Sequence, residues 1–192
     1  MRKGIKERKT KETEILIKLN LDGSGANAID TGVGFFDHML ELFACHGGFD
    51  LEVACKGDVK VDAHHSVEDI GITLGKLFYE LLGDKRGIAR YAVSYVPMDE
   101  ALARTVVDIS GRPYLEYGGS LRGKIGDFDA ELVEEFLRAF ATYSLTTLHV
   151  DIIRGANLHH MAEAVFKSLA RALSSAVKIV GDKIPSSKGS LE

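Results

Sequence analysis

Residues 64–68 read HHSVE, and residues 159–163 read HHMAE, roughly half the chain later. Each stretch follows a segment whose composition predicts a β-strand, and an amphipathic helical segment precedes each strand. Two matching contexts of this kind predict an internal duplication. We therefore expect an α+β fold in which two pseudo-symmetric βα halves, at about residues 1–88 and 89–192, pack as a single domain.

Hydrophobic periodicity and glycine-rich breaks divide the chain into elements of ordinary length. Gly71 and Gly75 weaken the prediction of one helix, because glycine is a poor helix former. We predict helices over 35–48, 66–83, 128–143 and 157–180, strands over 14–21 and 146–155, a hairpin over 49–65, two or three strands over 91–119, and loops over 23–32 and 181–192.

The composition is that of a globular protein with a mildly acidic balance. The chain has 192 residues, of which 45% are hydrophobic and 27% charged, and its formal net charge is −4. Such a chain is a poor candidate for general nucleic-acid binding, and no apolar run approaches the roughly 18 residues of a membrane span. Cys45 and Cys55 are the only cysteines, which is typical of a reducing cytoplasm. We therefore expect a cytoplasmic protein whose partners include neither nucleic acid nor membrane.

The repeated stretches place histidine and glutamate where they can bind a metal ion together. In each stretch the first histidine and the glutamate are four residues apart, so they share one helix face. The second histidine points about 100° away. It either supports the first or binds a different ion, between the halves or between subunits. Mixed nitrogen and oxygen ligands favour manganese, iron, cobalt or zinc over calcium or magnesium. With one residue from each preceding helical segment, the candidate ligands are His38, His64, His65, Glu68, Glu135, His159, His160 and Glu163.

A second group of residues suits a small anion. Arg90 and Arg112 lie in short polar or turn-like contexts, and residues 185–190 read PSSKGS. This loop offers hydroxyls, free backbone N–H groups and the charge of Lys188, while arginine supplies a fork that matches phosphate oxygens. The sequence therefore favours a phosphate-bearing ligand, although the spacing is not that of a Walker loop.

Taken together, these strings resemble the imidazoleglycerol-phosphate dehydratase family, enzymes of histidine biosynthesis. The double HHxxE with the terminal PSSKG is the most specific part of this resemblance, which extends over essentially the whole chain. The matching segments lie at 11–13, 21–25, 36–40, 62–69, 99–101, 110–114, 157–164 and 185–189.

The resemblance implies a fold and an assembly. Each half-domain would be a four-stranded sheet packed on helices, and 24 subunits would form a homo-oligomer with active sites between subunits. Two Mn²⁺ ions would occupy each active site, held by the ligands named above, with Glu135 at a position where some members have histidine and others, as here, glutamate. The resemblance also implies that the substrate is bound by Glu12, Arg90, Arg112, Ser187 and Lys188.

The reaction that the resemblance implies is loss of water from imidazole glycerol phosphate, which gives imidazole acetol phosphate. The hydrogen that is lost has no neighbouring carbonyl group to acidify it, so we expect coordination of the imidazole ring to promote loss of the hydroxyl group. Glu12 is then our first candidate for the base and Glu68 the alternative. A histidine, with His65 as the candidate, or a metal-bound water could be the acid that protonates the leaving hydroxyl.

Two other functions use the same residues. Repeated histidines could join subunits through metal ions in a storage or assembly protein. A metallohydrolase could use a metal-activated water against phosphate esters. An anion site formed by Arg90, Arg112 and the 185–190 loop argues against the first of these. Activity on phosphate esters without activity on imidazole glycerol phosphate would favour the second.

Overall fold

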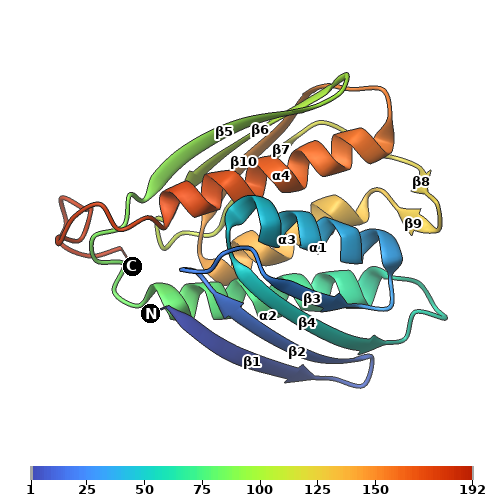
Figure 1. Cartoon of the computed structure of the whole chain (residues 1–192), viewed down its shortest axis with the longest axis horizontal. Helices are drawn as coiled ribbons and strands as arrows, with labels where there is room; N and C mark the ends of the chain where they lie inside the picture. Colours follow the sequence, from blue (N-terminus) through green and yellow to red (C-terminus); the bar gives the residue numbers. More distant parts are fainter. Residues whose placement is uncertain (1, 192) are drawn as a thin grey trace.

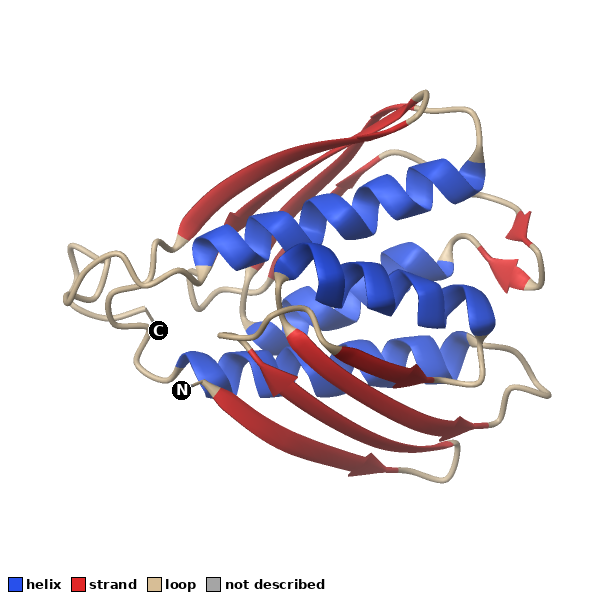
Figure 2. Cartoon of the chain, in the orientation of Figure 1, coloured by secondary structure: helices blue, strands red, loops and turns tan. Residues whose placement is uncertain are grey.

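The computed structural model describes residues 2–191 and contains two four-stranded sheets with a layer of helices between them (Figures 1 and 2). The helices are α1 (Gly34–Gly47), α2 (His64–Leu82), α3 (Leu132–Ser144) and α4 (Leu158–Ala176). The strands are β1 (Lys3–Lys9), β2 (Thr13–Asn20), β3 (Asn27–Asp30), β4 (Asp50–Gly57), β5 (Tyr91–Met98), β6 (Ala101–Asp108), β7 (Tyr114–Gly118), β8 (Lys124–Ile125), β9 (Phe128–Asp129) and β10 (Thr147–Arg154).

The two sheets have the same topology. The first has the order β1-β2-β4-β3 and the second the order β5-β6-β10-β7. In each sheet three strands are antiparallel, while the fourth runs parallel to its neighbour: β3 to β4 and β7 to β10. The predicted fold class, an α+β duplication with a four-stranded sheet in each half, is confirmed. The division near residue 88 stays a prediction, since one continuous core joins both halves.

The helices pair across the two halves rather than within them. Helix α1 packs against α4, and α2 packs against α3. The ring of Phe136 on α3 contacts Phe36 on α1 and Phe166 on α4, with centroids 5.4 and 5.3 Å apart. Aromatic contacts of this kind bury large apolar areas. The core therefore depends on both repeats at once.

Alternating side chains attach each sheet to the helix layer. In β2, Ile15, Ile17 and Leu19 are buried while the residues between them are more exposed. Period-two alternation places one face of a strand against the core. The same pattern in β6 turns its own buried face toward α4.

Several local predictions are wrong. The expected hairpin over 49–65 contains one strand, β4, and its second half is a turn that leads into α2. The expected loop over 23–32 contains β3, and the unassigned basic segment 3–9 is the edge strand β1. These strands were missed because they carry charged or polar residues where the prediction of a strand expects apolar ones. Such residues are common on edge strands and on solvated sheet faces.

The helix boundaries also differ from the predicted ones. Helix α2 begins at His64, two residues early, so both histidines of the first HHxxE lie within the helix. Helix α3 begins later than expected because β9, which pairs with the short β8, occupies its predicted start. Helix α4 ends at Ala176, before the bridge between Ile88 and Ile179. None of the helices within residues 2–191 is long and apolar enough to cross a lipid bilayer.

We predict that Gly75→Ala destabilises the protein, although alanine is the better helix former by about 1 kcal/mol. A Cβ at this position would lie 2.8 Å from the backbone oxygen of Phe140 on α3 and 3.0 Å from the backbone nitrogen of Ser144. Overpacking of this kind costs about 1–3 kcal/mol. Chemical denaturation measures the effect. Gly34→Ala is the control, because a Cβ there meets no atom within 4 Å; equal stability changes in the two variants would contradict the prediction.

Candidate metal centre

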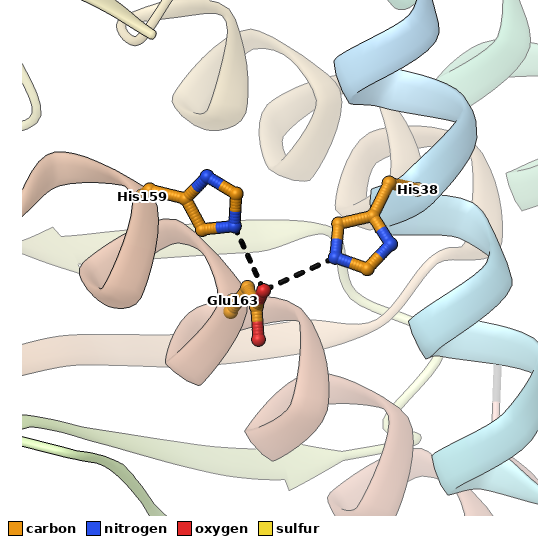
Figure 3. Close-up of side chains that lie close together, drawn as sticks. All are labelled: His38, His159 and Glu163. Atoms are coloured by element: carbon orange, nitrogen blue, oxygen red, sulfur yellow. Dashed lines mark hydrogen bonds and ion pairs between the residues drawn. The ribbon is translucent and has the colours of Figure 1, made fainter.

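Three side chains from two helices converge at one end of the helix layer. Glu163 Oε1 lies 3.1 Å from His38 Nε2 and 2.9 Å from His159 Nε2, as Figure 3 shows. The three ligand atoms lie within 4.8 Å of one another. Two imidazoles and a carboxylate at this spacing can surround one transition-metal ion. The predicted cooperation of His159 and Glu163 on one helix face is therefore consistent with the structure, and His38 joins them from the other half.

Glu163 is the electrostatic centre of this cluster. Its burial by itself raises the pKa, but hydrogen bonds from Lys167, His38 and His159 outweigh burial and lower the pKa to about 2. Lys167 Nζ lies 2.5 Å from the second carboxylate oxygen. Sequence analysis did not select Lys167, although its position four residues after Glu163 places both on one helix face.

Local structure holds the second HHxxE in place. The side chain of Asn157 caps α4 by accepting hydrogen bonds from the backbone N–H groups of His159 and His160. The ring of Phe35 packs edge-on against His159, with centroids 5.2 Å apart. His38 and His159 line a cavity of about 820 Å³, together with the loop before α2 and the β8–β9 hairpin. A small ligand could reach the cluster through this cavity.

The first HHxxE is arranged more openly. His64 Nε2 and Glu68 Oε2 are 4.0 Å apart on α2, and both side chains are nearly half exposed. Helix α3, which carries half-buried Glu135, packs against α2. Among residues 2–191, no group of three close ligand atoms includes His64, Glu68 or Glu135. Their roles as ligands stay predictions.

The second histidine of the first repeat faces away from this pair. His65 Nδ1 lies 3.2 and 3.1 Å from the two carboxylate oxygens of Asp58, and its Nε2 lies 3.8 Å from Glu12 Oε1. The hydrogen bond with Asp58 raises the pKa of His65. The β1–β2 turn thus brings Glu12, a predicted catalytic residue, next to His65, another one.

The second repeat contains the equivalent arrangement. His160 Nδ1 lies 2.7 Å from Glu100 Oε2, and its Nε2 lies 3.9 Å from Asp99 Oδ2. Hydrogen bonds from His160 and from the backbone N–H groups of Asn157 and Ala156 lower the pKa of Glu100 to about 2, and Glu100 in turn raises the pKa of His160. Sequence analysis missed these partners because a carboxylate in a turn is usually an ordinary surface residue.

The predicted anion-binding residues gather at the opposite end of the molecule. Arg90 donates hydrogen bonds to Asp108 (2.7 Å) and to the backbone oxygen of Pro185 (2.8 Å), so it ties the 185–190 loop to β6. Arg112 Nη2 lies 3.9 Å from the same Asp108 and is largely exposed. Ser187 and Lys188 are exposed on the loop that Arg90 holds. Arg90 is therefore already paired, whereas Arg112 and Lys188 are accessible to an anion.

Helix α4 separates the two groups. The backbone N–H of Arg90 donates to the carbonyl of Ala176 at the end of α4, whereas His159 lies at its beginning. A helix of 19 residues is about 28 Å long. Figure 1 shows the start of α4 and the C-terminal tail at opposite ends of the helix layer. One small molecule cannot contact both groups within a single chain.

The chain is similar in sequence to known proteins over its full length. The sequence model described as imidazoleglycerol-phosphate dehydratase matches residues 31–173. A protein of that name from Exiguobacterium sp. is 56% identical over the full length of both chains, and one from Caldanaerobacter subterraneus is 55% identical, also at full length.

Solved structures show the same fold. The crystal structure of imidazoleglycerol-phosphate dehydratase from Staphylococcus aureus superposes with a TM-score of 0.83 at 46% identity, covering 92% of this chain and 99% of that one. The structure of the enzyme from Pyrococcus furiosus, in complex with a compound called (S)-C348, gives 0.84 at 35% identity, covering 97% and 100%.

The duplicated fold and these relatives define the chain as a hydro-lyase, an enzyme that removes water from its substrate. Within that class it belongs to the imidazoleglycerol-phosphate dehydratase family of histidine biosynthesis, and the resemblance noted in the sequence is confirmed.

We predict that Glu163 makes the metal-free protein sensitive to acid. The pKa of Glu163 is about 2 in the folded protein, whereas the ordinary value, expected in the unfolded chain, is 4.5. Its carboxylate therefore stabilises the fold above pH 4.5. This contribution is lost as the pH falls from 4.5 toward 2. Urea denaturation across this range should therefore show a smaller loss of stability in Glu163→Gln than in the wild type.

Glu52→Gln is the matched control, because Glu52 forms an ion pair with Lys18 on the exposed face of the first sheet. Its acid profile should follow that of the wild type. Identical acid profiles for Glu163→Gln and the wild type would contradict the electrostatic role of Glu163.

Proposed function

We propose that this enzyme converts imidazole glycerol phosphate to imidazole acetol phosphate and water, using two Mn²⁺ ions per active site. The observation that supports this most is the convergence of His38, His159 and Glu163 from two helices, in a chain of this family. Neither an assembly protein nor a phosphate-ester hydrolase accounts for the family relationship.

The ligand set fits two ions. His38, His159 and Glu163 would hold one, and their mixed nitrogen and oxygen donors suit manganese. We assign the remaining predicted ligands to the second ion or to a neighbouring subunit, namely His64, His65, Glu68, Glu135 and His160. When bound, the divalent metal would polarise the imidazole ring of the substrate and so promote loss of the adjacent hydroxyl group.

Residues of the first repeat would carry the proton transfers. Glu12 is exposed on the β1–β2 turn, so its carboxylate is free to take the proton from the substrate carbon. His65 keeps a proton more readily than an ordinary histidine, because Asp58 raises its pKa. As an alternative to its role as a ligand, His65 would give that proton to the leaving hydroxyl group, which departs as water. The resulting enol then becomes the ketone. Glu68 is the alternative base.

The distance between the metal centre and the anion group supports a site formed by several subunits. We propose that Arg112, Ser187 and Lys188 of one copy bind the phosphate of a substrate whose ring lies at the metal centre of another, and that Arg90 holds the loop. The outer face of the second sheet exposes Tyr91, Val93, Tyr95, Tyr114 and Ile153, as expected where copies associate. We propose a homo-oligomer of 24 subunits.

We also propose that the enzyme works in the cytoplasm. Cys45 and Cys55 are both free. A reducing compartment such as the cytoplasm preserves free thiols.

Removal of metal tests the proposed function directly. Protein treated with a chelator should lose turnover of imidazole glycerol phosphate, and added Mn²⁺ should restore both turnover and the particle mass measured by light scattering. Full turnover in the stripped protein would rule out the metal requirement. Metal-dependent assembly without any turnover would rule out the proposed reaction.

We predict that Glu12→Gln lowers kcat by about 100-fold or more, because a positioned general base contributes a factor of about 10²–10⁴. Steady-state kinetics with saturating Mn²⁺ measures the effect. Glu14→Gln is the control, since Glu14 is an exposed neighbour paired with Lys9. Turnover of Glu12→Gln within about threefold of the wild type would assign the base to another group, with Glu68 next in line.

A further inference from the structure

The two second histidines of the repeats share a feature that the sequence did not reveal. Each presents Nδ1 to a carboxylate of its own half: Asp58 for His65 and Glu100 for His160. In each case Nε2 is directed elsewhere. A partner on one ring nitrogen decides which nitrogen carries the hydrogen, and therefore which one can bind a metal ion.

Glu100 has little freedom in this contact. Its Oε1 accepts hydrogen bonds from the backbone N–H groups of Asn157 (2.8 Å) and Ala156 (3.2 Å), while Oε2 contacts His160 Nδ1. The backbone groups can only donate, so they hold the carboxylate in one orientation below the start of α4. Its negative charge is also favourable at a helix N-terminus.

The charge of Glu100 dictates the hydrogen on His160. An ionised carboxylate only accepts hydrogen bonds, so Nδ1 must carry a hydrogen at a separation of 2.7 Å. In a neutral imidazole the lone pair is then on Nε2. His160 therefore presents Nε2 as a potential ligand without any further rearrangement.

We propose that Glu100 is a positioning residue that fixes His160 in the tautomer with a metal-binding lone pair on Nε2. This inference rests on the proposed function, since it assumes that His160 binds one of the metal ions. It means that the metal-binding orientation of His160 requires a residue outside the HHxxE stretch, on the β5–β6 turn.

The Glu100→Gln substitution, which replaces one carboxylate oxygen with an NH₂ group, distinguishes the positioning of His160 from ordinary helix capping. In Glu100→Gln the only amide oxygen must face the two backbone N–H groups, which leaves the NH₂ group facing Nδ1. Nδ1 then has to accept, so the hydrogen of His160 moves to Nε2 and its lone pair there is lost. The variant keeps the cap of α4 while it reverses the tautomer.

Asp58→Asn is the matched comparison in the other repeat. Among the described residues, the hydrogen bonds of the Asp58 side chain all go to Nδ1 of His65. The asparagine oxygen can therefore turn toward Nδ1 and keep its hydrogen in place. The two variants remove the same charge, but only one should reverse a tautomer.

The experiment measures the tautomer itself. Metal-stripped protein labelled with ¹⁵N-histidine would be examined by solid-state NMR at about pH 9, where imidazole is neutral. The His160→Asn variant assigns the His160 signals among the seven histidines. We expect a hydrogen on Nδ1 in the wild type and on Nε2 in Glu100→Gln, with His65 unchanged in Asp58→Asn.

Calorimetric titration of the stripped protein with Mn²⁺ provides the second readout. Loss of a group that orients a metal-binding histidine typically weakens metal affinity by about 10–100-fold, and we expect this of Glu100→Gln but not of Asp58→Asn. Lower thermal stability of Glu100→Gln with an unchanged His160 tautomer would overturn the proposal. Capping of α4 would then be the only role of Glu100.

A hydrogen on Nε2 of His160 in the wild type would also overturn the proposal, and this result does not depend on whether Glu100→Gln folds. The NMR readout needs neither metal nor substrate. Wild-type protein that binds no Mn²⁺ would instead contradict the proposed function, whatever tautomer His160 adopts.

Discussion

The pairing of helices across the repeats is the constraint on which the rest of the structure depends. Helices α2 and α4 cover the sheets of their own halves, so their remaining apolar faces need a partner, which the other half supplies through α3 and α1. Gly71 and Gly75 permit the close approach of α2 and α3, and contacts between phenylalanine rings join α1, α3 and α4. Neither half could bury its helices alone, and the same contact carries His38 to Glu163.

Electrostatics then distinguishes the two histidines of each HHxxE. The first shares a helix face with its glutamate, and in the second repeat this glutamate is buried among two imidazoles and Lys167. The second histidine turns toward a carboxylate on a β-turn, at Asp58 or Glu100. A buried carboxylate needs such compensation, whereas an exposed imidazole needs an orienting partner to present one particular nitrogen. One short motif therefore supplies two histidines in different electrostatic surroundings, which point in different directions.

The length of α4 has a consequence for assembly. It keeps the cluster around Glu163 apart from the group of Arg90, Arg112 and the C-terminal loop. Under the proposed function each chain would therefore offer two partial sites, and parts of different copies would have to meet before a small phosphorylated molecule could touch both. Metal binding, subunit association and catalysis would in this way be coupled, since each requires the geometry that the others stabilise.

The sequence by itself determined the duplication, the fold class, the main helices and the family, because periodicity and the spacing of HHxxE are local properties of the chain. It also indicated that His159 and Glu163 act together, since residues that are four apart in a helix lie on the same face. It missed β1 and β3, whose charged or polar residues resemble a loop until a neighbouring strand pairs with them. Only the tertiary structure decided that His38 joins the second repeat, that Arg90 is already paired with Asp108, and that Glu100 faces His160. These contacts join residues far apart in the chain, and they form because buried helix faces and helix ends require partners that local sequence does not specify.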